Sequence, residues 1–355
     1  MGESATTRTQ WGPALTLFLL SPAIGELLSS SMPPAEFFNP FGFLLNAVLY
    51  GGGALLCREL TVRWGKGWLT LFILAAAYGI VEEGLMVKSF FNENWVDIGN
   101  LGTYGRWAGV NWVWSLNLTI YHAAISIATP VFLTGLLFPK RRSDRWLGPR
   151  VFWTVFGLLV ADVLFGLMFI GDGPNSPPYR PPFIQYNLFL LLVIGLVWLG
   201  WRVPHPFLAP GRTDVQPLRR WRHTLGFFLL GLGGLAGLFA VGAVLAGAGA
   251  PALVTMAGTA GWEALIWWCA FRLSRRGRAW SDKHKLALLS GALAPFVFLA
   301  FLWGHAIPRK ENVVGMGYVG LFFLALLLLT YLSVRHSQRG EVPAEHTVGT
   351  NRGHG

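Results

Sequence analysis

Residues 67–87 read GWLTLFILAAAYGIVEEGLMV, an apolar run that ends in two adjacent glutamates. The hydrocarbon core of a bilayer is about 30 Å thick and needs roughly 20 apolar residues per helix, so this run has the length of one membrane span. Within it, Ala75, Ala76 and Gly79 form a small-residue face that lets a neighbouring helix approach closely. The run therefore predicts a helix inside a membrane bundle.

The rest of the chain repeats this pattern. Of its 355 residues, 53% are hydrophobic and only 13% are charged, whereas soluble domains carry about 25% charged residues. We therefore predict an all-α, polytopic transmembrane helix bundle in the cell membrane, with the lipid bilayer as its main partner. About ten spans are expected, at 10–31, 41–57, 67–87, 110–138, 151–170, 183–201, 224–247, 251–271, 286–304 and 313–334.

The basic residues give the orientation of these spans. If the N-terminus is inside, 23 of the 28 lysines and arginines fall in inside segments, and only five fall outside. Cytoplasmic loops carry such a positive excess, so both the N-terminus and the C-terminus are expected to be cytoplasmic. The net charge of +11 thus reflects topology, and we expect no nucleic-acid partner.

This topology divides the chain into four parts. A cytoplasmic N-terminus covers residues 1–9, and residues 10–138 hold the first four spans with a polar site. Residues 139–334 hold the remaining spans, and residues 335–355 are expected to form a disordered cytoplasmic tail. The outer loop 88–109 is rich in both aromatic and polar residues, which is typical of a lid or an interfacial segment over the outer mouth of the bundle.

Polar residues inside the spans point to a functional site. An ionisable group at the centre of a membrane helix costs about 2.5–3.5 kcal/mol on insertion scales, so each such residue is a candidate. The fourth span carries polar residues at spacings of 4, 4, 3, 4 and 3, which places all of them on one face of a helix. This face either forms a hydrogen-bonded seam between helices or lines a site; its residues are Asn111, Ser115, Thr119, His122, Ser126 and Thr129.

Carboxylates lie at a similar depth on the first and third spans. Glu26 follows Pro22 by one turn in the outer half of the first span, and Glu82 and Glu83 end the third. Successive helical residues point about 100° apart, so Glu82 and Glu83 are expected to face different partners. The alternative is that both lie at the membrane surface. A stripe on the second span, at spacings of 4, 3 and 4, completes the group: Asn46, Tyr50, Gly53 and Cys57.

The pair Glu82-Glu83, followed about forty residues later by His122 inside another span, resembles the first two motifs of a known family. These motifs are EExxxR and FxxxH of the CAAX-protease and bacteriocin-processing intramembrane proteases. The resemblance implies an eight-helix membrane fold in which glutamates and histidines activate water for peptide hydrolysis. Over residues 82–122, Val87 stands at the arginine position and Leu118 stands at the phenylalanine position; no intramembrane HxxxN follows.

Three classes of function remain open at this point. The first is an intramembrane enzyme acting on a lipid or peptide, with Glu82 or Glu83 as general base and His122 as acid, base or metal ligand. The second is a proton- or ion-coupled transporter of a small polar substrate, and the third is a scaffold subunit that binds a partner through its outer loop. In the first two readings the substrate is bound by Glu26, Asn111, Ser115 and Thr119.

The sequence leaves the cofactor open, with a divalent metal as the candidate. A catalytic zinc ion takes three protein ligands and keeps one open position. Among the intramembrane residues, the expected trio is Glu26, Glu83 and His122.

Overall fold

The computed structural model describes residues 8–95, 97–171, 177–204, 221–274, 280–306 and 315–340. Over these residues the chain is almost entirely helical, which confirms the predicted all-α class, and nine helices are long and apolar enough to span a membrane. The eighth expected span, 251–271, forms helix α11 (Ala252–Leu273), but this helix is not among the nine. Its three tryptophans, two threonines and Glu263 lower its mean hydropathy.

The first four spans each contain a π-helical segment, in which the hydrogen-bonded turn is one residue wider than in an α-helix. The first span joins α1 (Trp11–Pro22) to η1 (Ala23–Leu28), and the second joins α3 (Pro40–Asn46), η2 (Ala47–Gly51) and α4 (Gly52–Arg63). The third joins α5 (Trp68–Ile80) to η3 (Val81–Met86), and the fourth joins α6 (Trp112–Tyr121), η5 (His122–Ala128) and α7 (Thr129–Leu137).

The later helices are regular over their described lengths. They are α8 (Pro149–Phe169), α9 (Phe183–Arg202), α10 (Trp221–Gly247), α12 (Asp282–Ala306) and α13 (Met316–Gly340). Helix α13 continues through residues 335–340, where we expected the tail to begin, because no helix-breaking residue occurs between Arg335 and Arg339. The rest of the predicted tail and residues 1–7 lie outside the described residues.

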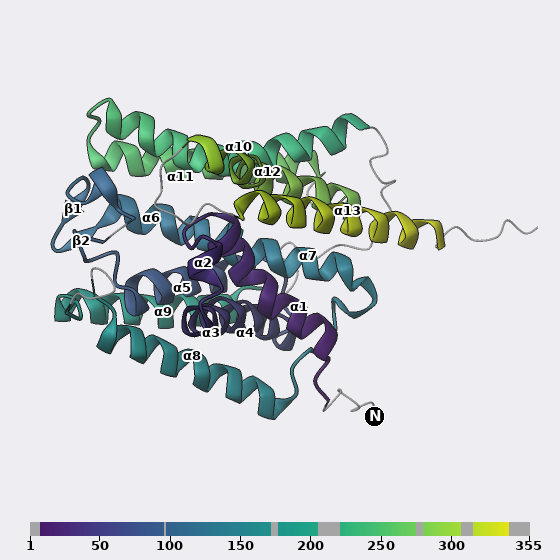
Figure 1. The fold of residues 1–355 in the computed structure, drawn as a ribbon, viewed down its shortest axis with the longest axis horizontal. Helices are drawn as coiled ribbons and strands as arrows, with labels where there is room; N and C mark the ends of the chain where they lie inside the picture. Colours follow the sequence, from purple (N-terminus) through teal and green to yellow (C-terminus); the bar gives the residue numbers. More distant parts are fainter. Residues whose placement is uncertain are drawn as a thin grey trace, which may run out of the picture.

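The third and fourth spans form the centre of the bundle. Their apolar windows are both 72% buried, whereas the window of α9 is only 11% buried. In Figure 1, α10, α11, α12 and α13 lie together on one side of α6 and α7, and α5, α9 and α8 lie on the other side. Polar residues of the third and fourth spans are therefore held inside the protein, away from lipid.

Close packing within the α10–α13 group depends on small residues. A Cβ atom at Gly231 of α10 would fall 2.0 Å from the carbonyl oxygen of Leu288, and one at Gly291 of α12 would fall 1.9 Å from that of Phe228. The two backbones thus touch at both positions, as small residues allow in membrane helices. This contact fixes α12 against α10.

The loop between the third and fourth spans, which we expected on the outside, is folded against the bundle. It contains a short 3₁₀ turn, η4 (Gly99–Leu101), and a hairpin of β1 (Arg106–Trp107) and β2 (Val110–Asn111). Phe90 is fully buried in this loop. The remaining short helices are α2 (Pro34–Phe37) and η6 (Pro139–Arg141).

Candidate functional site

His122 lies between two glutamates at the centre of the bundle. It is the first residue of η5, and its Nδ1 atom is 2.8 Å from Oε2 of Glu82. Its Nε2 atom is 3.0 Å from Oε1 of Glu83. All three side chains are buried, so the two carboxylates contact opposite edges of one imidazole ring away from solvent.

The expectation that Glu82 and Glu83 face different partners was wrong. Both residues belong to η3, where the wider π-helical turn reduces the angle between consecutive side chains. The imidazole ring of His122 also presents its two nitrogens on different edges, so two diverging carboxylates can both reach it. Both glutamates are buried inside the protein, and their depth in the membrane stays a prediction.

Tyr50 connects a third carboxylate to this pair. Its hydroxyl group contacts a carboxylate oxygen of Glu26 and a carboxylate oxygen of Glu82 at hydrogen-bonding range. Tyr50 lies in η2 and is fully buried. Five side chains from the first four spans thus form one connected group, which we call the polar cluster: Glu26, Tyr50, Glu82, Glu83 and His122.

Each residue of the polar cluster lies on a π-helical segment. Glu26 is in η1, Tyr50 is in η2, the glutamate pair is in η3, and His122 begins η5. π-Helices are rare, and they occur mostly as single turns inside α-helices, frequently at functional sites. Their convergence on one set of ionisable side chains supports a functional role for the cluster.

Further polar side chains orient the ends of the cluster. The Ser126 hydroxyl group lies 3.0 Å from Nδ1 of His122, one turn along the same helix. The Ser89 hydroxyl group donates a hydrogen bond to Glu83, and the indole N–H of Trp114 donates to Ser89 at 3.0 Å. Ser89 and Trp114 were missed by sequence reasoning, because neither belongs to a polar stripe within a span.

The other predicted site residues lie nearer the N-terminal end of the fourth span. The Asn111 side chain caps α6 by accepting a hydrogen bond from the backbone N–H of Trp114, and it donates another to the Leu101 carbonyl. The Ser115 hydroxyl donates to the Asn111 carbonyl of its own helix. The backbone of Thr119 packs against Gly79 of α5, where an added Cβ atom would fall 3.3 Å from the Thr119 Cα. Their role in substrate binding stays a prediction.

The cluster includes a group of residues that could hold a metal ion. One ligand atom each of Glu82, Glu83 and His122 lie within 4.8 Å of one another, and no other such group occurs in the described part of the chain. The expected trio contained Glu26 in place of Glu82, and this was wrong because Glu26 reaches the imidazole only through Tyr50. Two carboxylates and one imidazole are a ligand set that suits a divalent cation.

Lys88 follows the glutamate pair and is completely buried. Its ammonium group donates to the carbonyl oxygens of Gly166 at 2.8 Å and Ile170 at 2.7 Å, at the end of α8. Burial, followed by the positive charge of Arg180, lowers the pKa of the Lys88 amine to about 8. Lys88 thereby joins the end of the third span to α8.

Two further intramembrane carboxylates lie apart from the cluster. Asp162 of α8 is buried, and neither of its oxygens has a hydrogen-bond partner among the described residues. Glu263 of α11 likewise has an unpartnered Oε1 atom over the same ranges, and it lines a separate cavity. Neither was assigned a partner from the sequence.

The fold and the cluster define a class: a multi-pass helical membrane protein with buried carboxylates and a histidine at its centre. The chain belongs to a family described as an uncharacterized membrane protein family, whose model matches residues 15–289. That range contains every residue of the polar cluster. No curated protein and no solved structure matches the chain, and the comparisons do not show the resemblance to the CAAX proteases.

Proposed function

We propose that the protein is an intramembrane hydrolase that activates a water molecule against a bond in a lipid or peptide. The observation that carries this proposal is the double contact of His122, at 2.8 Å with Glu82 and at 3.0 Å with Glu83, inside the bundle. A buried acid beside an imidazole is the pairing with which enzymes transfer protons to and from reacting groups. The motif resemblance over residues 82–122 supports the same assignment.

The surroundings of the two glutamates suggest different roles. The Glu82 side chain is 4% exposed and is held by Tyr50, whereas the Glu83 side chain is 11% exposed and adjoins the outer loop through Ser89. We therefore assign Glu83 as the general base and His122 as the general acid. As water attacks the substrate carbonyl carbon, its proton passes to Glu83 and His122 protonates the leaving group. Glu82 orients the imidazole, as a carboxylate does in a catalytic triad.

Glu82, Glu83 and His122 could together hold a divalent ion. A metal ion at such a site lowers the pKa of a bound water and so supplies the nucleophile at neutral pH. Elemental analysis of the purified protein, with Glu82→Gln as the ligand variant, separates metal-assisted from metal-free hydrolysis. Metal that is bound to the wild-type protein and absent from Glu82→Gln supports metal-assisted hydrolysis.

Turnover in liposomes tests the proposal. The purified protein is reconstituted with a mixed membrane-lipid extract and a pool of membrane-embedded peptides, and products are identified by mass spectrometry. Glu83→Gln and His122→Ala are expected to abolish product formation, since removing a general acid or base typically costs about 10²- to 10⁴-fold in rate. Asp162→Asn is the matched control, because Asp162 is a buried intramembrane carboxylate outside the cluster. Turnover that survives in both cluster variants contradicts the proposal.

A proton-coupled transporter is the second candidate, and one observation favours it. Tyr50 joins Glu26 to Glu82, so polar contacts run continuously from the first span to Ser89: hydrogen bonds, and the 2.8 Å contact between Glu82 and His122. Chains of this kind carry protons in membrane pumps and transporters. Substrate-dependent proton flux that Glu26→Gln abolishes, in the absence of any hydrolysis product, would select this function instead.

A further inference from the structure

A cavity lies between the first four spans and the α10–α13 group, and it is separate from the polar cluster. It has a volume of about 470 Å³ and is bounded by α5, α6, η5, α7, α10, α11 and α12. This volume falls within the range of about 300–1,000 Å³ that is typical of ligand sites. None of the five cluster residues is among the described residues that line it. The cavity is therefore a separate site.

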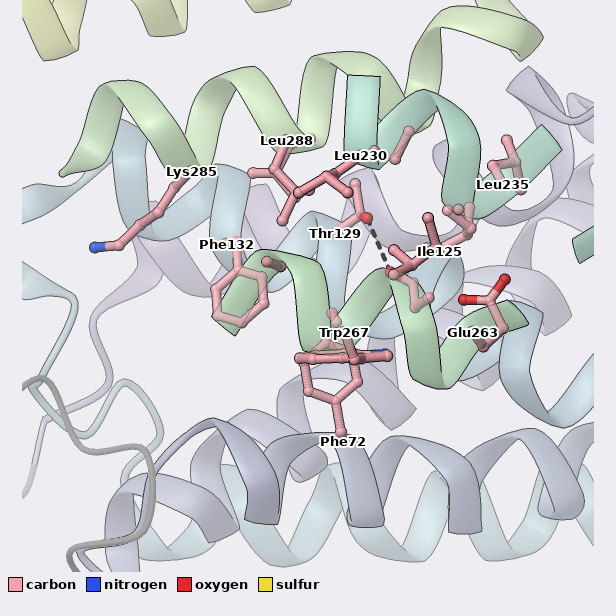
Figure 2. Close-up of a pocket in the computed structure, with 18 of the residues that line it drawn as sticks. Phe72, Ile125, Thr129, Phe132, Leu230, Leu235, Glu263, Trp267, Lys285 and Leu288 are labelled. Carbon is pink, nitrogen blue, oxygen red and sulfur yellow. Dashed lines mark hydrogen bonds between the residues drawn. The ribbon is translucent and has the colours of Figure 1, made fainter. Parts of the chain in front are cut away.

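The walls of the cavity are apolar and aromatic over most of their length. Phe72, Phe132 and Trp267 face the cavity from three different segments (Figure 2). The one hydroxyl group labelled in this view, that of Thr129, already donates to the Ala124 carbonyl at 2.8 Å. Such walls suit a hydrocarbon chain, which packs against apolar and aromatic side chains along its length.

Charged residues lie at the two ends of this apolar space. Lys285 and Glu263 both line the cavity and occupy opposite ends of it (Figure 2). At the Lys285 end, the ammonium group and the guanidinium group of Arg142 share the single carboxylate of Asp282, at 2.7 and 3.0 Å. Two cations on one anion leave a net positive charge at this end.

A hydrogen-bond donor lies near this end of the cavity, since the ring of Trp68 lies 5.8 Å from that of Trp280 and 5.9 Å from the ammonium group of Lys285. The indole N–H of Trp280, which lines the cavity, is buried without a hydrogen-bond partner among the residues described. A buried unpaired donor costs about 1–3 kcal/mol, so it favours a ligand that brings an acceptor. The opposite end, with the carboxyl group of Glu263, does not suit an anion.

We propose that this cavity binds one acyl chain of an anionic membrane phospholipid, with the phosphate group at Lys285 and Trp280. The chain extends along the aromatic walls toward α11, and the head group is oriented by the charge difference between the two ends. Pairing of a basic residue with an anionic head group at a membrane surface is a recurrent form of lipid recognition. The site is independent of the proposed hydrolysis at the polar cluster.

Native mass spectrometry of the detergent-purified, delipidated protein tests this site. The protein is titrated with phosphatidylglycerol and with phosphatidylcholine carrying identical acyl chains. Wild type is expected to prefer phosphatidylglycerol, and Lys285→Gln is expected to weaken its binding about fivefold, to the level of phosphatidylcholine. Arg150→Gln removes an exposed charge outside the cavity and is the matched control.

A cavity-filling variant tests the acyl-chain site itself. Gly234 lines the cavity, and an added Cβ atom there would meet only Ile266, at an ordinary contact distance of 3.5 Å. Gly234→Leu is expected to weaken binding of both lipids, whereas Gly195→Leu, at a position with nothing within 4 Å, leaves both unchanged. Wild-type binding in Gly234→Leu, or an unchanged lipid preference in Lys285→Gln, overturns the proposal.

Photo-crosslinking provides a readout that does not depend on how a variant folds. Phosphatidylglycerol with a diazirine in the middle of one acyl chain is bound to the wild-type protein and irradiated. Crosslinks are expected at Phe132 and Leu288, which face the cavity from α7 and α12 (Figure 2). Crosslinks confined to the exposed faces of α8 and α9 would show that lipid binds only at the outer surface, and they also overturn the proposal.

Discussion

The ring of Tyr50 packs directly against the backbone of Gly25, so that a Cβ atom at residue 25 would fall 2.6 Å from the ring. Tyr50 is also the residue whose hydroxyl joins Glu26 to Glu82. The absence of a side chain at Gly25 therefore sets the position of the ring that links the first span to the third.

Gly25→Ala is expected to displace Tyr50 and to destabilise the protein. The added methyl group overpacks a buried contact, which typically costs about 1–3 kcal/mol. Thermal unfolding in detergent measures the effect, and Gly195→Ala, on the exposed face of α9 with nothing within 4 Å, provides the control. Equal melting temperatures for the two variants would show that Tyr50 is not held by Gly25.

Two tyrosines in adjacent spans provide a matched test of the hydrogen bonds in the cluster. Tyr50 and Tyr78 are both buried, but only the Tyr50 hydroxyl has hydrogen-bond partners within the described ranges. Tyr50→Phe removes the hydroxyl group that both carboxyl groups contact, and we expect a loss of about 1–3 kcal/mol of stability. Tyr78→Phe removes an unpaired hydroxyl and should leave the melting temperature unchanged or raise it. The opposite order would contradict the described network.

The sequence predicts the spans well because burying some 20 apolar residues in lipid is a large, additive effect that hydropathy measures directly. The expected span at 251–271 forms the helix α11, although Glu263 and the tryptophans of that helix reduce its hydropathy. The depth of Glu26 and His122, expected from the topology, stays a prediction. Depth alone does not give contacts, however, and it did not show which carboxylates meet the imidazole.

The π-helical turns are the part of the site that could not be predicted. A shift from α- to π-helical hydrogen bonding changes no residue and leaves the hydropathy pattern intact, so it depends on tertiary packing. An α-helical angle of about 100° between neighbouring residues predicts that Glu82 and Glu83 face different partners. In the η3 turn, however, both side chains contact His122. A pattern based on regular helices therefore fails at the residues that form the site.

A buried ion pair at the other end of the second span gives a third prediction. Glu59 is fully buried and contacts Arg58 at 3.0 Å and Arg63 at 3.2 Å. It also accepts a hydrogen bond from the backbone N–H of Trp146. Glu59→Gln leaves the buried guanidinium group of Arg58 without its counter-charge, and breaking such a pair costs about 3–5 kcal/mol. Unfolding of Glu59→Gln and of the exposed control Glu93→Gln can be compared at equal detergent concentration. A loss no larger than that of the control would show that the pair contributes nothing.

The buried amine of Lys88 gives a prediction about stability. Lys88→Met removes hydrogen bonds to the carbonyl groups of Gly166 and Ile170 at the end of α8. Both carbonyl groups keep a backbone donor, the N–H of Ile170 and the N–H of Tyr179. Hydrogen bonds to a charged group contribute about 1.5–3 kcal/mol, so the melting temperature should still fall. Lys140→Met, at an exposed position, is the control and should leave the melting temperature unchanged.

The difference in stability between wild type and Lys88→Met is also expected to depend on pH. The pKa of the Lys88 amine falls from its usual value of 10.5 to about 8 in the folded protein, because burial disfavours the charge. Between these two values the unfolded chain holds more protons than the folded one, so the stability of wild type relative to Lys88→Met should rise with pH. Below pH 8 both states are protonated and the difference should be constant. Melting temperatures of the two proteins at pH 7 and pH 9.5 measure this change, and a difference that does not rise at the higher pH would mean that the pKa of Lys88 is not lowered in the folded protein.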